Sequence, residues 1–294
     1  MSHLTEEIAT QPACWRRAAA LIGSAPRASG LPVAGERVAV LGCGTSYYVG
    51  QAYAALRERA GLGETDAFPA SEFPAARRYD RVLALSRSGT TTEVLTALGR
   101  VAPGTPTVAI TADPATPVGG AAGAVLTLDF ADERSVVQTR FATTALALLR
   151  AHLGADVGVL AEQAEAALAE PLPAVLTGAE QWSFLGTGWT VGLANEAALK
   201  LREAAQAWTE SYVAMEYRHG PISIAAPGRV VWIFGDAPDG LVGQIRGTGA
   251  HVETWAGDPL ADLVRAHRLA DALATVRGLD PDRPRHLDRS VVLT

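Results

Sequence analysis

Cysteine and long hydrophobic runs are scarce in this sequence of 294 residues. Its two cysteines, Cys14 and Cys43, fit no CxxC or Cys/His pattern, which favours buried free thiols over a metal site. No apolar run approaches the roughly 18 residues that a membrane span needs, and the start is acidic and polar, unlike a signal peptide. We therefore expect a cytoplasmic protein without a bound metal or cofactor.

Positive charge is also in deficit, since 25 Lys and Arg face 31 Asp and Glu, for a net charge of -6. A nucleic acid or an anionic membrane surface is therefore not expected as a partner, although a local pocket can still bind a small anion. Hydrophobic residues make up 48% and charged residues 19%, which is a globular composition.

Apolar runs that end at Gly/Ser clusters recur along the chain, each followed by a helical period or a turn. In the first half they occupy 37–61, 81–101, 106–118 and 123–130, with an apolar helix over 135–154. This alternation favours an α/β fold of parallel strands joined by crossover helices.

The pattern restarts in the second half of the chain. Residues 180–204 mirror 36–60, 229–236 match the strand at 81, and 249–257 favour a further strand. An internal duplication explains this economically. It predicts one domain over 1–160 and another over 161–294, with a helical linker near 154–178.

The stretch ALSRSGTTTEV, residues 84–94, places five hydroxyls and Arg87 where a strand hands over to a helix. Free N–H groups and the helix dipole favour an anion at such a turn, and Gly89 allows close approach. A second turn of this kind is GCGTS, residues 42–46. The alternative is ordinary helix capping by Thr90 or Thr91 with Glu93.

A charged face is predicted on the helix NEAALKLREAAQAW, where Glu196, Lys200 and Glu203 lie at i, i+4 and i+7. An ordinary surface ion pair is the alternative to a catalytic group. Downstream, a Gly-Pro pair follows His219 and fixes its backbone in a stiff turn, which suits an acid–base group as well as a plain loop.

Four motifs, GCGTSYYVG, SRSGTTTEV, EAALKLREAAQAWTESY and EYRHGPISI, together resemble the sugar isomerase (SIS) family. The resemblance covers nearly the whole chain and is nearest to the isomerase half of glucosamine-6-phosphate synthase and to related amino-sugar-phosphate deaminase/isomerases. It implies two flavodoxin-like, three-layer SIS domains and a homodimer.

The resemblance also implies roles for individual residues. A sugar phosphate would be bound by the first domain, through Thr45, Ser46, Ser86, Arg87, Ser88 and Thr91, with the backbone near Val136 as a further lining turn. Glu203 would move a proton between C1 and C2, with Lys200 before it. His219, lent by the partner subunit, would open the sugar ring.

The sequence departs from the synthase in three respects. It has no glutaminase domain, Arg289 stands where the synthase tail has a lysine, and Arg87 replaces a glutamine of its loop. A guanidinium is a poor imine former, so Arg289 is expected to bind substrate hydroxyls or a carboxylate instead. Three hypotheses follow: an amino-sugar-phosphate isomerase/deaminase that releases or uses ammonia, a deglycase of sugar-phosphate–amino-acid conjugates, and a non-catalytic sugar-phosphate sensor.

Overall fold

The computed structural model describes residues 2–24 and 30–293, and these form two compact units. The five-strand unit comprises Ala13–Glu133, Gln138–Gly158 and Asp288–Thr294. The four-strand unit comprises Met1–Pro12, Arg134–Val137 and Val159–Leu287. The chain therefore leaves and re-enters each unit, so that residues 289–293 form hydrogen bonds with residues 87–92 from its first half.

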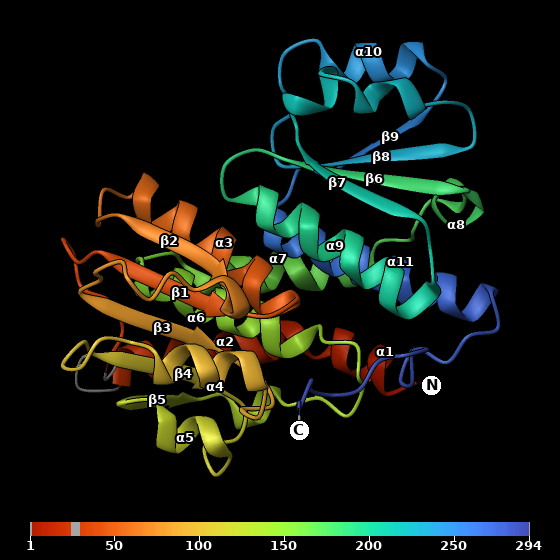
Figure 1. Ribbon diagram of the computed structural model, residues 1–294. Helices are drawn as coiled ribbons and strands as arrows, with labels where there is room; N and C mark the ends of the chain where they lie inside the picture. The colour runs from red at the N-terminus through yellow and green to blue at the C-terminus, as the bar shows by residue number, and fades with distance from the viewer. Residues whose placement is uncertain (1, 25–29, 294) are drawn as a thin grey trace. The chain divides into compact units, whose positions relative to one another are not determined.

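The five-strand unit is built on a parallel sheet in the order β2-β1-β3-β4-β5, which is the flavodoxin-like order (Figure 1). Its strands are β1 (Val38–Gly42), β2 (Thr65–Pro69), β3 (Arg81–Leu85), β4 (Thr107–Thr111) and β5 (Ala124–Thr127). The helices are α2 (Gln11–Ser24), α3 (Thr45–Arg59), α4 (Thr92–Gly99), α5 (Pro117–Ala121) and α6 (Arg140–His152), with 3-10 turns η1 (Ala70–Glu72) and η2 (Asp129–Ala131).

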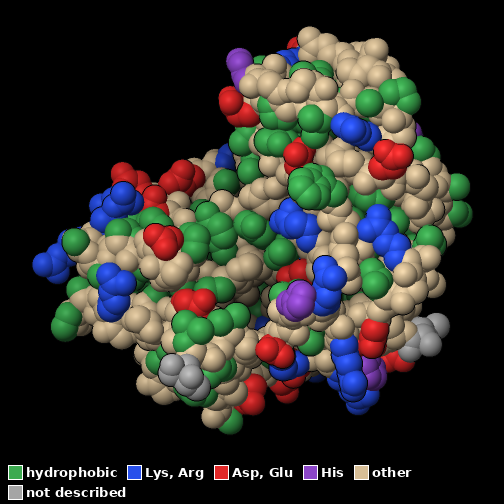
Figure 2. Space-filling view, turned by 45° about the vertical axis from the view of Figure 1, so that its right-hand side comes forward, with side chains coloured by type: hydrophobic (Ala, Val, Ile, Leu, Met, Phe, Trp, Pro, Cys, Tyr) green, Lys and Arg blue, Asp and Glu red, His purple; other side chains and the backbone are tan. Residues whose placement is uncertain are grey.

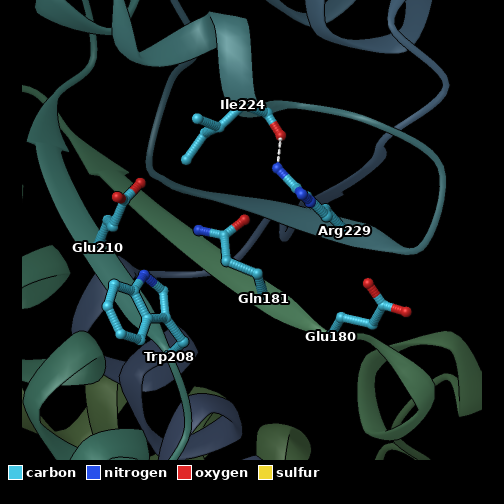
Figure 3. A pocket seen from close by; sticks show the side chains of 6 residues that line it. All are labelled: Glu180, Gln181, Trp208, Glu210, Ile224 and Arg229. Carbon is cyan, nitrogen blue, oxygen red and sulfur yellow. Dashed lines mark hydrogen bonds between the residues drawn. The ribbon is translucent and has the colours of Figure 1, made fainter.

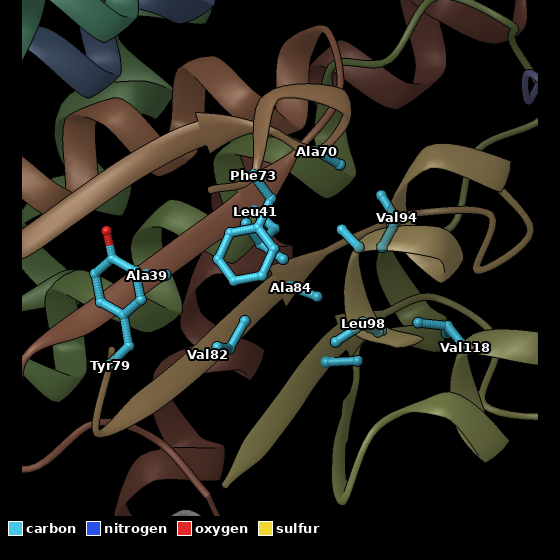
Figure 4. Close-up of a cluster of buried hydrophobic side chains, with 12 residues drawn as sticks. Ala39, Leu41, Ala70, Phe73, Tyr79, Val82, Ala84, Val94, Leu98 and Val118 are labelled. Atoms are coloured by element: carbon cyan, nitrogen blue, oxygen red, sulfur yellow. The ribbon is translucent and has the colours of Figure 1, made fainter. Parts of the chain in front are cut away.

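Both faces of this sheet are buried, because alternate residues of each strand point to opposite sides. In Figure 4, Leu41 and Val82 pack with Val94 and Leu98 of α4 on one face. On the other face α3 approaches closely enough that a Cβ added at Gly50 would lie 3.0 Å from Val40. Helices on both faces explain why β1 reads as a continuous apolar run.

The four-strand unit holds a second parallel sheet, in the order β7-β6-β8-β9 (Figure 1). Its strands are β6 (Gln181–Gly186), β7 (Thr209–Val213), β8 (Arg229–Phe234) and β9 (His251–Thr254). The helices are α1 (His3–Ala9), α7 (Val157–Ala169), α8 (Ala174–Gly178), α9 (Thr190–Ala205), α10 (Leu241–Gly247) and α11 (Pro259–Val276), with η3 (Glu216–Arg218) and η4 (Pro221–Ile224).

Large aromatic side chains fill the face of this sheet that carries α9 and α11. Phe184 lies 6.0 Å from Trp232 between ring centroids, and the Trp232 indole donates to Asp262 of α11 at 2.9 Å. The opposite face packs Leu185 and Ile233 against α10. This unit too therefore has three layers.

Burial raises the pKa of Asp262 from 3.8 to about 6, although Trp232 and Arg265 donate hydrogen bonds to its carboxylate. At a pH between these two pKa values, the Asp262 carboxyl is protonated in the folded chain and ionised in the unfolded chain. The contribution of this carboxyl to the free energy of unfolding therefore falls as the pH rises from about 4 to about 6, by roughly 2–3 kcal/mol, and is constant above.

Comparing Asp262→Asn with the unmodified protein by urea denaturation at several pH values isolates this contribution. The difference between the two free energies of unfolding is expected to change across that window. A difference independent of pH would show that the carboxyl titrates normally.

The predicted α/β class with two parallel sheets is confirmed. The matching orders β2-β1-β3-β4 and β7-β6-β8-β9 are what a duplication predicts, and the duplication itself stays a prediction. The contiguous domains 1–160 and 161–294 also remain a prediction. The compact units differ from them at both chain ends, because 1–12 lies in the four-strand unit and 288–294 in the other.

Candidate active site

The hydroxyl-rich loop joins β3 to α4 at the carboxyl edge of the five-strand sheet, where it was predicted. Ser86 is buried, and its Oγ accepts a hydrogen bond from the Gly89 amide at 3.2 Å. Gly89 has φ +64°, and a Cβ there would lie 1.9 Å from Thr116 Oγ1. Any other residue at position 89 would be strained and would clash, so the tight loop depends on this glycine.

The loop hydroxyls converge on Ser290 of the chain's last segment. Ser290 Oγ lies 2.9 Å from Thr90 Oγ1, 3.1 Å from Ser88 Oγ and 3.4 Å from Thr91 Oγ1. Thr91 is the N-cap of α4 but makes no side-chain capping bond. Capping by Thr91 is therefore not observed, and the loop instead presents a cluster of neutral donors at a helix N-terminus.

The second predicted turn lies on the neighbouring strand. β1 pairs with β3 in parallel, so both strands end at the same sheet edge. Thr45 and Ser46 are the first residues of α3, and both are buried. A Cβ at Gly42 would lie 2.6 Å from the backbone of Ser46, which explains a glycine at the end of β1. The structure thus brings both turns to one edge of the sheet.

Arg87 is oriented by a buried carboxylate. Its Nη1 lies 3.4 Å from Glu133 Oε2, with side chains 5% and 0% exposed, and its Nη2 donates to the Arg289 carbonyl at 3.3 Å. Glu133 also accepts from the amides of Thr139 at 2.6 Å and Arg140 at 2.7 Å, at the start of α6. The Arg87 guanidinium is therefore part of the loop and also compensates the buried charge of Glu133.

Arg289 lies in the same unit as the loop. Its guanidinium donates to the Glu133 carbonyl and pairs with the Asp132 carboxylate, while 40% of its side chain is exposed. Val136, which belongs to the four-strand unit, donates its amide to the Asp282 carbonyl at 3.2 Å. The substrate-binding roles of Arg289 and Val136 stay predictions.

Glu196, Lys200 and Glu203 of α9 share one face, as their spacing predicted. Lys200 is fully buried and is the only lysine of the chain, in which every other basic side chain except histidine is arginine. Its Nζ donates to Glu203 Oε2 and lies 3.8 Å from Glu196 Oε1. Glu196 is also buried, whereas 20% of the Glu203 side chain is exposed. The alternative of an ordinary surface ion pair is therefore wrong.

Glu203 thus presents an ion-paired carboxylate that a solute can reach. His219 follows η3 and is exposed, with its amide bonded to the Glu216 carbonyl at 2.9 Å. Gly220 has φ +129° and Pro221 begins η4, so the predicted stiff turn is confirmed. A contribution of His219 to a partner's site stays a prediction.

A cavity of about 290 Å³ opens in the four-strand unit, near the amino ends of β6 and β8 (Figure 3). It is lined by Glu180, Gln181, Trp208, Glu210, Ile224 and Arg229, and includes no residue predicted for the site. On the face drawn in Figure 2, basic and acidic side chains are interspersed.

Over residues 2–24 and 30–293, no helix is both long and apolar enough to cross a membrane. The same described residues include no group of three or more His, Cys, Asp or Glu side chains arranged to hold a metal ion.

No family model matches the sequence. Among curated proteins, the glutamine–fructose-6-phosphate aminotransferases (isomerizing) of Zymomonas mobilis and Symbiobacterium thermophilum are 26% and 29% identical to it, over 88% of this chain and 52% of each relative. The chain therefore spans about half the length of these relatives. Glucosamine-6-phosphate deaminase from Thermotoga maritima has a crystal structure that matches 99% of this chain and 100% of its own, with a TM-score of 0.82 and 25% identity.

The resemblance to the sugar isomerase family is thereby confirmed. Tagatose-6-phosphate ketose/aldose isomerase from Escherichia coli shares the fold of this chain, with a TM-score of 0.83 and 20% identity over 99% of this chain and 96% of its own. The sequence and fold comparisons thus agree with the four motifs on which the resemblance was based.

Three groups at these sites escaped the sequence analysis. They are Glu133, Ser290 and the buried partner of Glu196, which is His267. Each acts through a residue far along the chain, so local spacing gave no sign of it. The sequence does show that Lys200 is the single lysine of the chain.

Proposed function

We propose that this protein is an amino-sugar-phosphate isomerase/deaminase, in which the Ser/Thr loop binds the phosphate and Glu203 transfers the proton. The observation that carries the proposal is the pairing of Glu203, partly open to solvent, with the single, buried lysine of the chain. The deaminase of Thermotoga maritima, which this chain matches over its full length, supports an amino sugar as substrate.

The chemistry requires a base next to the reacting carbons. Converting a 2-amino aldose phosphate into a ketose, or the reverse, moves a proton between adjacent carbons beside a carbonyl or imine. A single carboxylate can take the proton from one carbon and return it to the next. Lys200 orients the Glu203 carboxylate, and His219 is the proposed acid–base group for ring opening, with ammonia released or used.

Phosphate binding is assigned to neutral donors. Hydroxyls of Ser88 and Thr91, together with the positive end of the helix dipole, favour an anion at the start of α4. Since Arg87 is paired with Glu133, its charge is partly compensated, and the hydroxyls are expected to supply most of the selectivity.

The double variant Ser88→Ala/Thr91→Ala tests this assignment. Each lost charge-assisted hydrogen bond is worth about 1.5–3 kcal/mol, so the affinity for glucosamine-6-phosphate should fall at least about tenfold, as measured by calorimetry. Ser71→Ala, an exposed serine of the same unit, serves as the control. Unchanged affinity in a folded double variant would place the phosphate elsewhere.

Two further hypotheses would use the site residues differently. A deglycase of sugar-phosphate–amino-acid conjugates would use Arg289 for the amino acid's carboxylate, and the exposed part of that side chain is compatible with this role. A sensor would need no base, so the buried Lys200 beside Glu203 favours an enzyme. An assay of amine release distinguishes the three hypotheses. Release from hexosamine phosphates supports the isomerase/deaminase, release from conjugates supports the deglycase, and release from neither supports the sensor.

A further inference from the structure

We infer that His267 is a positioning residue for the Glu203 base, acting through Glu196 and Lys200. The inference rests on the proposed function, but its contacts are independent of it. His267 lies on α11 and is fully buried. Its Nε2 lies 3.0 Å from Glu196 Oε2, and its Nδ1 lies 3.4 Å from the side-chain nitrogen of Gln11.

Hydrogen bonding around Gln11 fixes the form of the imidazole. Gln11 Nε2 donates to the Ile8 carbonyl at 3.2 Å, so the nitrogen of the amide faces this region and its second proton points to His267 Nδ1. Nδ1 must then accept, which leaves the proton on Nε2. A neutral His267 therefore donates to Glu196.

This donation decides which carboxylate holds the lysine. Two carboxylates compete for Lys200, since Glu203 is hydrogen-bonded to Nζ and Glu196 Oε1 lies 3.8 Å away without a hydrogen-bond partner among the described residues. A buried carboxylate without a donor is costly. By supplying a donor to Oε2, His267 lets Glu196 remain buried while the ammonium stays on Glu203.

Loss of this donor should therefore move the lysine. In His267→Leu, Glu196 is expected to draw the ammonium away from Glu203, leaving the base misplaced. Displacements of about 1 Å in a catalytic group cost up to about a hundredfold in rate, so kcat should fall tenfold to a hundredfold with KM within about twofold. Adding Glu196→Gln removes the competing charge and should restore part of kcat.

Because Lys200 is the only lysine, lysine labelled with ¹³C and ¹⁵N gives a single side-chain NMR signal that reports its partner without any assay of activity. That signal should shift in His267→Leu, and should return toward its original position in His267→Gln, whose amide can donate to Glu196. His152→Leu, in the five-strand unit, is the matched control and should leave both the signal and kcat unchanged.

An unmoved lysine signal in folded His267→Leu would overturn the inference, whatever the activity. If the leucine variant does not fold, the same comparison is made in Glu196→Gln/His267→Leu, whose lysine signal should match that of Glu196→Gln alone. A signal that responds in a protein inert toward sugar phosphates would support the positioning contact and contradict the proposed function.

Discussion

Replacing Glu203 by glutamine is expected to lower the turnover of an amino-sugar phosphate by about 10²–10⁴-fold, because a positioned general base contributes a factor of this size. The amide keeps the shape and a hydrogen-bond acceptor for Lys200 but cannot take up the proton. Affinity for the sugar phosphate should stay within a few fold, since the proposed phosphate contacts are on the Ser/Thr loop. Steady-state kinetics and calorimetry on the same preparation measure both quantities.

Glu162→Gln provides the matched control, because Glu162 is an exposed carboxylate on α7 of the same unit. It should retain full turnover. If Glu203→Gln kept most of its activity, Glu203 would lose its role as the base, and another group would have to move the proton.

The second large effect is expected at Arg87. Truncation to alanine leaves the Glu133 carboxylate, which is fully buried, without its guanidinium. Removing one partner of a buried pair typically costs about 3–5 kcal/mol, and the backbone amides that remain on Glu133 moderate this to about 3 kcal/mol. Urea denaturation should show this loss of the free energy of unfolding, and Arg100→Ala, at an exposed site of the same unit, should not.

A double variant separates the structural role of Arg87 from phosphate binding. Glu133→Gln removes the buried charge, so its combination with Arg87→Ala should recover part of the lost stability. Full stability in Arg87→Ala together with a loss of phosphate affinity would contradict this account, and would support the sequence-based expectation that Arg87 is one of the residues that bind the sugar phosphate.

Much of the fold was predictable because parallel strands buried on both faces are continuous apolar runs. β1, β3, β4 and β8 all have this pattern, and each lies within a predicted strand. The strand β7 was missed, since it lies at a sheet edge and its TESYV sequence is only partly buried. Helices α1 and α2 were also missed, because the first residues offered no repeated strand–helix pattern to extend.

The local parts of the site were predictable for a related reason. Hydroxyls at a strand-to-helix turn and charges at i, i+4 and i+7 are set by spacings within one element. Contacts between distant segments were not, since Ser290 meets Ser88 across 202 positions and His267 meets Glu196 across 71. The sequence of the helix also does not show which of its side chains are buried. Glu196 and Lys200, which the alternative placed in a surface ion pair, lie in a buried network instead.

Hydrogen exchange at C2 of glucosamine-6-phosphate in D₂O, followed by proton NMR, tests the central claim most directly. The account predicts that the unmodified protein replaces this hydrogen with deuterium and that Glu203→Gln does not. Tight binding of the sugar phosphate without any exchange in the unmodified protein would contradict catalysis and leave a binding protein.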